Sequence, residues 1–168
     1  MVTALLVVDV QNGLMAEQPY QVSLFLETVA QTIKQARTRQ TEVIYVRHHD
    51  DDLPMGSREW KIHDSVAPQA NELVIDKAYN SAFKETGLRA YLASKGVERL
   101  IIVGMATDYC IDTTVKVAFE MGYEVAVVEH GTTTFGTSDI PANILIDYYE
   151  TIWHDRFAQV LPLERLFN

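Results

Sequence analysis

The sequence predicts an α/β fold in which six strands form a doubly wound parallel sheet with helices on both faces. Short runs of β-branched and aliphatic residues are typical of strands buried on both sides, and they recur along the chain. Segments with apolar residues at helical spacing separate these runs, and glycine or Asn-Gly turn signals often lie between them. Strands that alternate with helices are joined by right-handed crossovers. Six strands in this rhythm predict the order 3-2-1-4-5-6.

The first strand is expected at residues 4–8, and Asp9 closes it. The segment that follows looks like a loop, because Asn12-Gly13 is a turn signal. From about residue 20 to residue 38, the apolar residues fall on one face of an amphipathic helix. The residues that define this face are Val22, Phe25, Leu26, Val29, Ile33 and Ala36.

Residues 42–47 predict the second strand and residues 73–75 a short third strand. A long polar loop, 48–71, joins them. Loops of this length in a compact domain usually line or cover a site. Leu88, Tyr91 and Leu92 then mark a helix that ends near Gly96.

The central stretch begins with a buried strand at residues 100–103, which Gly104 ends. Thr107 and Asp108 are both candidates for the N-cap of the helix that follows. The only cysteine of the chain, Cys110, then lies in the first turn of that helix. The positive end of a helix dipole favours a thiolate over a thiol. Cys110 is therefore either a nucleophile or a small buried hydrophobe.

The last third of the chain predicts two further strands, at residues 123–128 and 158–161, with a Gly/Thr-rich loop at 131–137. Ser138 or Asp139 is expected to cap the intervening helix, with Pro141 in its first turn. The inner face of this helix is predicted to carry Ile144, Tyr148 and Ile152.

The composition is that of a single domain, 1–168, with 48% hydrophobic residues and a formal charge of −9. The negative charge opposes binding to nucleic acid or to an anionic membrane. No membrane span or signal peptide is recognisable. One cysteine excludes an internal disulfide and fits a reducing, cytoplasmic location.

The predicted strand order gives Cys110 a functional context. In a doubly wound sheet, ligands bind at the carboxyl ends of strands 1 and 4, where the chain reverses direction. Asp9 follows strand 1 and Cys110 follows strand 4. The fold alone therefore places a carboxylate beside the sole thiol.

Lys77, after the third strand, completes a candidate constellation. Asp9 is suited to act as a base for the thiol, and Lys77 to favour the thiolate and orient the carboxylate. Backbone N–H groups between Gly104 and Cys110 can stabilise an oxyanion. The alternatives to these catalytic roles are a helix-capping role for Asp9 and an exposed surface position for Lys77. Negative charge near Cys110 would oppose thiolate formation unless Asp108 and Asp112 point outward.

Three motifs closely resemble those of the isochorismatase-like cysteine hydrolases. They are Leu-Leu-Val-Val-Asp-Val-Gln with Asp9, Asp-Lys-x-x-x-Ser-Ala-Phe with Lys77, and Gly-x-Ala-Thr-Asp-x-Cys with Cys110. The resemblance implies a three-layer α/β/α sandwich and an Asp-Lys-Cys triad. It also implies a cis peptide near Met105-Ala106 and oxyanion donors at Ala106 and Cys110. The implied reaction is hydrolysis of a small amide or ureido compound through a thioester, with no cofactor.

Departures from the family pattern narrow this expectation. Isochorismatases proper lack the cysteine, so Cys110 favours the amidohydrolase branch. Nicotinamidases carry a metal at an Asp-x-His pair and a later histidine, whereas this chain has His48-His-Asp-Asp-Asp52 and His63. We expect no metal, although a nicotinamidase-like enzyme with a non-standard metal site is an alternative. His130 replaces a residue common in the family, and it is either a polar pocket residue or a structural histidine.

Six residues in loops near the triad are expected to line a small, partly aromatic pocket. They are Gln11, Leu14, Trp60, Tyr109, Ile111 and Phe135. A catalytically silent binding or scaffold domain is the competing function. A dinucleotide-binding domain fails, because no Gly-x-Gly-x-x-Gly follows the first strand. The resemblance also favours a homo-oligomer, a dimer or larger, and the apolar tail 161–168 is a candidate interface.

Overall fold

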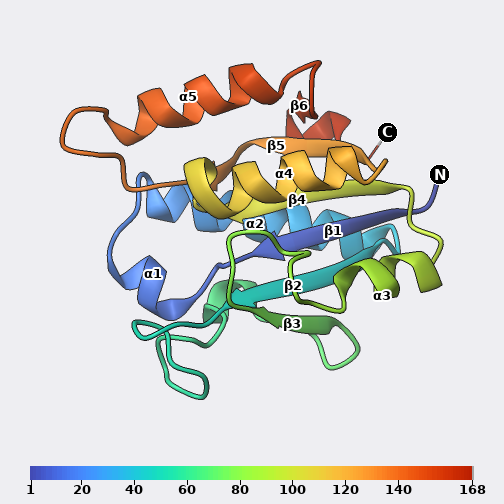
Figure 1. Ribbon diagram of the computed structural model, residues 1–168, viewed down its shortest axis with the longest axis horizontal. Helices are drawn as coiled ribbons and strands as arrows, with labels where there is room; N and C mark the ends of the chain where they lie inside the picture. The colour runs from blue at the N-terminus through green and yellow to red at the C-terminus, as the bar shows by residue number, and fades with distance from the viewer. Residues whose placement is uncertain (168) are drawn as a thin grey trace.

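The computed structural model describes residues 1–167 and contains one six-stranded sheet in the order β3-β2-β1-β4-β5-β6 (Figure 1). All five strand pairs are parallel, so the predicted topology is confirmed. The strands are β1 (Thr3–Val8), β2 (Glu42–His48), β3 (Leu73–Lys77), β4 (Arg99–Met105), β5 (Glu124–Thr133) and β6 (Gln159–Leu161).

Helices cover both faces of this sheet, which gives the three-layer α/β/α arrangement. The α-helices are α1 (Asn12–Ala16), α2 (Val22–Thr38), α3 (Leu88–Ser94), α4 (Asp112–Glu120) and α5 (Ala142–Trp153). A π-helical turn, η2 (Thr107–Ile111), leads into α4, and two short 3-10 turns are η1 (Asp64–Val66) and η3 (Leu163–Arg165). In Figure 1, α3 and α4 cross the front of the sheet and α2 passes behind it.

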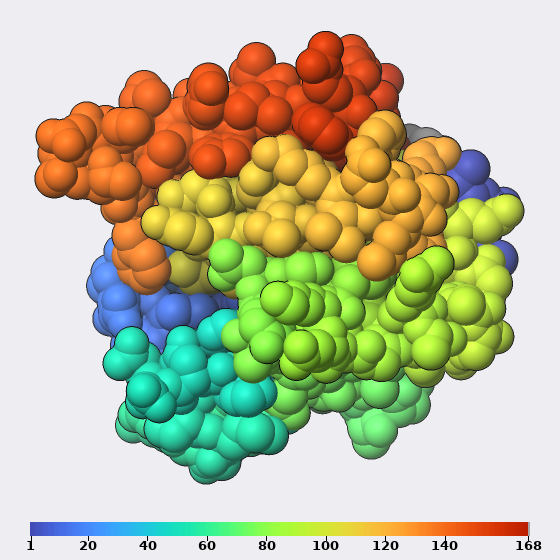
Figure 2. All heavy atoms as spheres, viewed as in Figure 1, coloured from blue at the N-terminus to red at the C-terminus, as the bar shows by residue number. Residues whose placement is uncertain are grey.

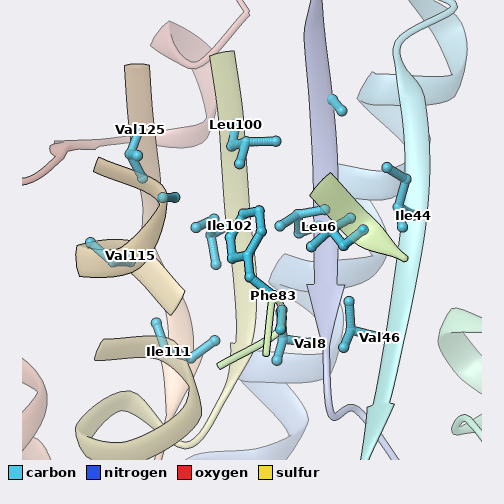
Figure 3. Packing of buried hydrophobic residues seen from close by; sticks show 14 of the residues in the cluster. Leu6, Val8, Ile44, Val46, Phe83, Leu100, Ile102, Ile111, Val115 and Val125 are labelled. Atoms are coloured by element: carbon cyan, nitrogen blue, oxygen red, sulfur yellow. The ribbon is translucent and has the colours of Figure 1, made fainter. Parts of the chain in front are cut away.

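Alternating side chains of the strands build two separate cores. On one face, Leu6 and Val8 of β1 pack with Ile102 of β4 against Ile111 and Val115 (Figure 3). On the other face, Leu5 and Val7 belong to a second cluster, which α2 closes with apolar residues at helical spacing. The near-continuous apolar runs of the strands are therefore explained by burial on both sides.

Gly104 allows the carboxyl ends of β1 and β4 to approach each other closely. Its φ is +135°, and a Cβ built there would lie 2.0 Å from the carbonyl oxygen of Val8. Only glycine fits this approach. The chain after β4 therefore passes close to the end of β1, where Asp9 begins the next loop.

The structure corrects several local expectations. The segment after β1 is the helix α1 rather than a loop. The N-cap positions are Ala106 before η2 and Pro141 before α5, and neither makes a side-chain capping bond, so Thr107, Asp108, Ser138 and Asp139 do not cap these helices. Residues 132 and 133, predicted as a loop, pair with Gly104 and Met105 as the end of β5, after an irregularity in the strand register.

The buried face of α5 also differs from the prediction. Of the three residues predicted to point inward, Ile152 packs against the core, whereas Ile144 and Tyr148 are exposed. The buried apolar residues of the helix include Leu145, Ile146 and Trp153. The helix carries apolar residues on more than one face, so helical spacing alone could not select the inner one.

The apolar C-terminal tail packs on its own chain. Leu166 is fully buried, and Leu161, Leu163 and Phe167 pack against the same cluster as α2. These side chains pack within the chain, and residue 168 of the predicted interface segment lies outside the described residues. None of the helices within residues 1–167 combines the length and the hydrophobicity that a membrane span requires.

Candidate active site

Three side chains from distant parts of the sequence meet at the carboxyl edge of the sheet. Asp9 follows β1, Lys77 ends β3, and Cys110 lies in η2 after β4. The Nζ of Lys77 lies 2.8 Å from Asp9 Oδ2 and 3.3 Å from Cys110 Sγ. On the surface, the segments around residues 50 (cyan), 80 (green) and 110 (yellow) meet on one side of the molecule (Figure 2).

Asp9 is held in an unusual backbone conformation. Its φ is +55°, in the left-handed region, and its backbone N–H donates to the carbonyl oxygen of Val46 at 2.9 Å. Asp and Asn tolerate this region better than most residues, and strained positions cluster at functional sites. The side chain is almost fully buried, and its Oδ1 has no hydrogen-bond partner within residues 1–167. That oxygen is therefore a carboxylate atom with unused acceptor capacity.

Lys77 is a fully buried lysine with a polar partner on every side. Besides Asp9 and Cys110, its Nζ contacts Nδ1 of His48 at 3.1 Å and donates to the carbonyl oxygen of Tyr79 at 3.0 Å. A buried ammonium is tolerated only when it is paired and hydrogen-bonded. Lys77 is thus the common centre that joins the carboxylate to the thiol.

Cys110 is the accessible member of the three, since its residue is partly exposed whereas Asp9 and Lys77 are buried. Its Sγ also faces Asn80 Oδ1 at 3.8 Å. The Met105–Ala106 peptide bond is cis, and the carbonyl oxygen of Ala106 accepts from the N–H groups of Tyr109 and Ile111. Cys110 is therefore the member of the three that lies nearest the surface, with the buried Asp9–Lys77 pair behind it.

Burial raises the pKa of the Cys110 thiol from 9.0 to about 12, and the negative charge of Asp9 adds to this effect. Lys77 acts in the opposite direction and lowers the pKa of the thiol. The sulfur is therefore a neutral thiol near pH 7, and not the thiolate that the helix dipole was expected to favour. Attack on a carbonyl consequently requires a base at the moment of reaction.

The two acidic residues that flank Cys110 in sequence are engaged elsewhere. Asp108 Oδ1 accepts from Thr134 Oγ1 at 2.6 Å. Asp112 accepts from Trp153 Nε1 and forms an ion pair with Lys116. Within residues 1–167, neither carboxylate forms a hydrogen bond with the Cys110 sulfur, whose partners are Lys77 and Asn80.

His48, at the end of β2, extends the constellation by one residue that the sequence did not single out for this role. Its Nδ1 faces Lys77, and its Nε2 lies 3.1 Å from Asp50 Oδ2. Burial lowers the pKa of His48, and the positive charge of Lys77 lowers it further. A histidine at the carboxyl end of a strand next to two triad strands was the available signal.

The candidate metal ligands of the long loop have other partners. Both ring nitrogens of His48 are occupied, and Nδ1 of His63 lies 2.8 Å from Ser65 Oγ. Among residues 1–167, no group of three or more His, Cys, Asp or Glu side chains could hold a metal ion.

The six predicted pocket residues differ in exposure, and Leu14 and Trp60 are intermediate. Tyr109 and Phe135 are exposed, whereas Gln11 and Ile111 are fully buried. Ile111 belongs to the hydrophobic core, which corrects the expectation of a pocket-lining role. The amide of Gln11 is consumed by backbone, since it accepts from the N–H of His48 and donates to the carbonyl oxygens of His48 and Trp60, each at 2.8 Å.

Leu14 and Trp60 contribute to packing and to loop structure. Leu14 packs against the cluster under α2. Trp60 stacks on Arg47, with the guanidinium carbon 3.4 Å from the ring centroid, and donates to Asp76 Oδ1 at 3.1 Å. The Trp60 indole therefore fastens the long loop to Arg47 of β2 and Asp76 of β3.

His130 lies away from the three central residues. It lines a cavity of about 280 Å³ together with residues of α2 and α5, among them Leu24 and Asp147. Neither Asp9, Lys77 nor Cys110 lines this cavity.

Known proteins share this arrangement of the chain. A family model described as the Isochorismatase domain matches residues 3–160. The isochorismatase family protein YddQ of Bacillus subtilis is 34% identical over 84% of this chain and 86% of its own length. Streptothricin hydrolase of Streptomyces noursei is 31% identical over 84% of this chain and 52% of its own length. The crystal structure of an isochorismatase family protein superposes with a TM-score of 0.91 at 32% identity, covering 95% of this chain and 97% of that one.

Proposed function

The chain belongs to the isochorismatase family, and on that premise we propose that it is a cysteine hydrolase that cleaves a carbon–nitrogen bond of a small amide or ureido compound. The observation that carries the proposal is the position of Lys77 Nζ, 2.8 Å from a buried carboxylate and 3.3 Å from the only thiol. A relative named as a hydrolase, streptothricin hydrolase, supports the same class of reaction.

In the first half of the proposed reaction, Asp9 accepts the thiol proton while Cys110 Sγ attacks the carbonyl carbon. A neutral thiol requires such a base, and Asp9 Oδ1 has the free acceptor capacity. The carbonyl π electrons move to oxygen, and the backbone N–H groups of Ala106 and Cys110 are the proposed donors to that oxyanion. Collapse of the tetrahedral species breaks the C–N bond, and the nitrogen takes the proton back from Asp9.

Lys77 stabilises the negative charge throughout the proton transfer in this buried site. The transfer moves a negative charge from Asp9 to Sγ, and both groups lie within 3.3 Å of the same ammonium. The positive charge therefore has a negative partner before and after the step. Without Lys77, a negative charge would have to form on sulfur in a desolvated place with no counter-ion.

The second half-reaction releases the acid. Asp9 takes a proton from water, whose oxygen attacks the thioester carbonyl. The C–S bond then breaks, and the proton returns to Sγ. The carboxylic acid or carbamic acid leaves, and the enzyme regains its thiol. In this scheme no metal or cofactor takes part.

Two alternatives are kept as outcomes of the test. One is a silent binding or scaffold domain with the same fold, and the other is a nicotinamidase-like enzyme with a non-standard metal site. Self-association, with the tail 161–168 as the candidate interface, and a cytoplasmic location also remain predictions.

The test is a hydrolysis screen over small amides and ureides, scored by ammonia release. Wild type and Cys110→Ala are assayed side by side, with and without a chelator. We expect at least one compound to be hydrolysed by the wild type alone, with no effect of the chelator. Equal activity of Cys110→Ala would refute the nucleophile, and loss of activity with the chelator would establish the metal alternative.

A further inference from the structure

Lys77 has more acceptors around it than it has protons to donate. An ammonium carries three N–H donors and no acceptor. Four acceptors lie within 3.3 Å of Nζ: Asp9 Oδ2, Cys110 Sγ, the carbonyl oxygen of Tyr79 and His48 Nδ1. If His48 and Tyr79 each take one N–H, the third is shared between Asp9 and Cys110.

The partners of His48 fix the tautomer of its ring. Because the Lys77 ammonium only donates, Nδ1 must be the bare, accepting nitrogen. Because the Asp50 carboxylate accepts, the proton of the neutral ring belongs on Nε2. A proton on Nδ1 would instead point at the ammonium.

We propose that His48, held by Asp50 in its Nε2–H tautomer, is a positioning residue that fixes the Lys77 ammonium between Asp9 and Cys110. This inference deepens the proposed function and rests on it. His48 does not contact the reacting atoms directly. It acts by occupying one Lys77 N–H, so that the remaining N–H can follow the negative charge from the carboxylate to the sulfur.

His48 and Asp50 are themselves held in place by hydrogen bonds. The backbone of His48 is clamped on two sides by the buried amide of Gln11, and it lies opposite Lys77 in the β2–β3 register. Asp50 Oδ1 accepts from the backbone N–H groups of Asp52 and Leu53, which leaves Oδ2 for His48. The geometry of the ring is therefore set by strand pairing and by a loop turn, and not by the substrate.

The charged groups that act on the ring are Lys77, Asp9 and Asp50. Lys77 opposes a positive charge on His48, whereas the two carboxylates favour it, and burial has the largest effect. The net result is a lowered pKa, so the ring is neutral near pH 7 and Nδ1 remains an acceptor.

Two substitutions of His48 separate an acceptor from a mere filler. His48→Asn places a carbonyl oxygen near the position of Nδ1, whereas His48→Phe keeps a ring without an acceptor. We expect His48→Phe to lower kcat by about 10-fold to 100-fold, the scale of a small misplacement of a catalytic group, with KM changed by less than about 3-fold. His48→Asn should keep kcat within about 3-fold of wild type. Equal losses in both variants would overturn the proposal.

Asp50→Asn tests the tautomer. The amide oxygen is retained by the N–H groups of Asp52 and Leu53, so the NH2 group faces Nε2 and moves the ring proton to Nδ1, against Lys77. We expect kcat to fall about 5-fold to 20-fold in the wild-type background but less than about 2-fold in the His48→Asn background. Asp51→Asn, an exposed neighbour on the same loop, is the matched control and should leave kcat unchanged. Additive effects of Asp50→Asn and His48→Asn would contradict the proposal.

Alkylation of Cys110 by iodoacetamide gives a readout that needs no substrate. Lys77 lowers the pKa of the thiol, so displacing Lys77 raises that pKa further. We therefore expect slower alkylation at pH 8 in His48→Phe, by about 3-fold or more, and a rate within about 2-fold of wild type in His48→Asn. If no amide is hydrolysed but alkylation follows this order, the proposed function fails, and the result supports only the part of the inference in which His48 holds Lys77 beside the sulfur. Unchanged alkylation in His48→Phe overturns the inference by itself.

Discussion

Replacing Asp9 by Asn should speed the alkylation of Cys110 by iodoacetamide and slow the hydrolysis that Cys110 is proposed to catalyse. The negative charge of Asp9 raises the pKa of the thiol, so its removal should lower that pKa and increase the thiolate fraction. Lys77 would then have the sulfur as its nearest remaining group able to carry a negative charge. Hydrolysis, by contrast, should fall about 100-fold to 10,000-fold, because the base that accepts the thiol proton is lost.

The magnitude follows from the position of the thiol. With a pKa of about 12 instead of 9.0, Cys110 has about a thousand times less thiolate at pH 8 than an ordinary cysteine. Removing one neighbouring charge lowers a pKa by about 1 to 3. Since a less basic thiolate is also less nucleophilic, the net gain in alkylation rate is about 3-fold to 30-fold.

The assay compares iodoacetamide labelling with ammonia release in the same protein samples. The chain has one cysteine, so labelling reports on Cys110 alone. Asp52→Asn, an exposed carboxylate on the long loop, serves as the control and should change neither rate. Slower labelling of Asp9→Asn, with intact folding by circular dichroism, would refute the assigned role of the carboxylate. Unchanged hydrolysis would refute it as well.

Three further predictions concern stability and cofactors. Lys77→Met leaves Asp9 as a buried charge without its ion-pair partner and should lower the free energy of unfolding, measured with urea, by about 3–5 kcal/mol. Adding Asp9→Asn should restore part of this loss, and no recovery in the double variant would contradict the pairing. Gly104→Ala places a Cβ 2.0 Å from a carbonyl oxygen and should lower the free energy of unfolding by about 4 kcal/mol or more. Gly122→Ala, which has open space around it, should lower it by only about 1–2 kcal/mol. Similar losses at the two sites would argue against the close approach at Gly104. EDTA should leave hydrolysis within about 2-fold of the untreated rate, and a loss that Zn²⁺ restores would exclude the metal-free scheme.

The sheet order and the meeting of Asp9, Lys77 and Cys110 were accessible from the sequence because both follow from topology. Buried strand runs and intervening helices imply a parallel sheet, and parallel strands bring their carboxyl ends to one edge. The residues at those ends then meet, whatever the details of the loops. This is why strand-end positions were predicted better than loop positions.

Features that depend on register and burial were not accessible in this way. The role proposed for His48 requires the β2–β3 register and the clamp by Gln11, neither of which has a signature in the sequence. The raised pKa of Cys110 depends on how deeply the sulfur is buried, which outweighs Lys77. Ile111 was misplaced because it is adjacent to the nucleophile in sequence but points into the core.

The central claim is that Cys110 carries the acyl group between the two half-reactions. Mass spectrometry of the enzyme, quenched in acid during turnover of a compound found in the hydrolysis screen, tests it most directly. We predict an added acyl mass on the peptide that contains Cys110, which disappears when the substrate is exhausted and is absent in Cys110→Ala. An acyl group on any other residue, or turnover by Cys110→Ala at the wild-type rate, would contradict the account.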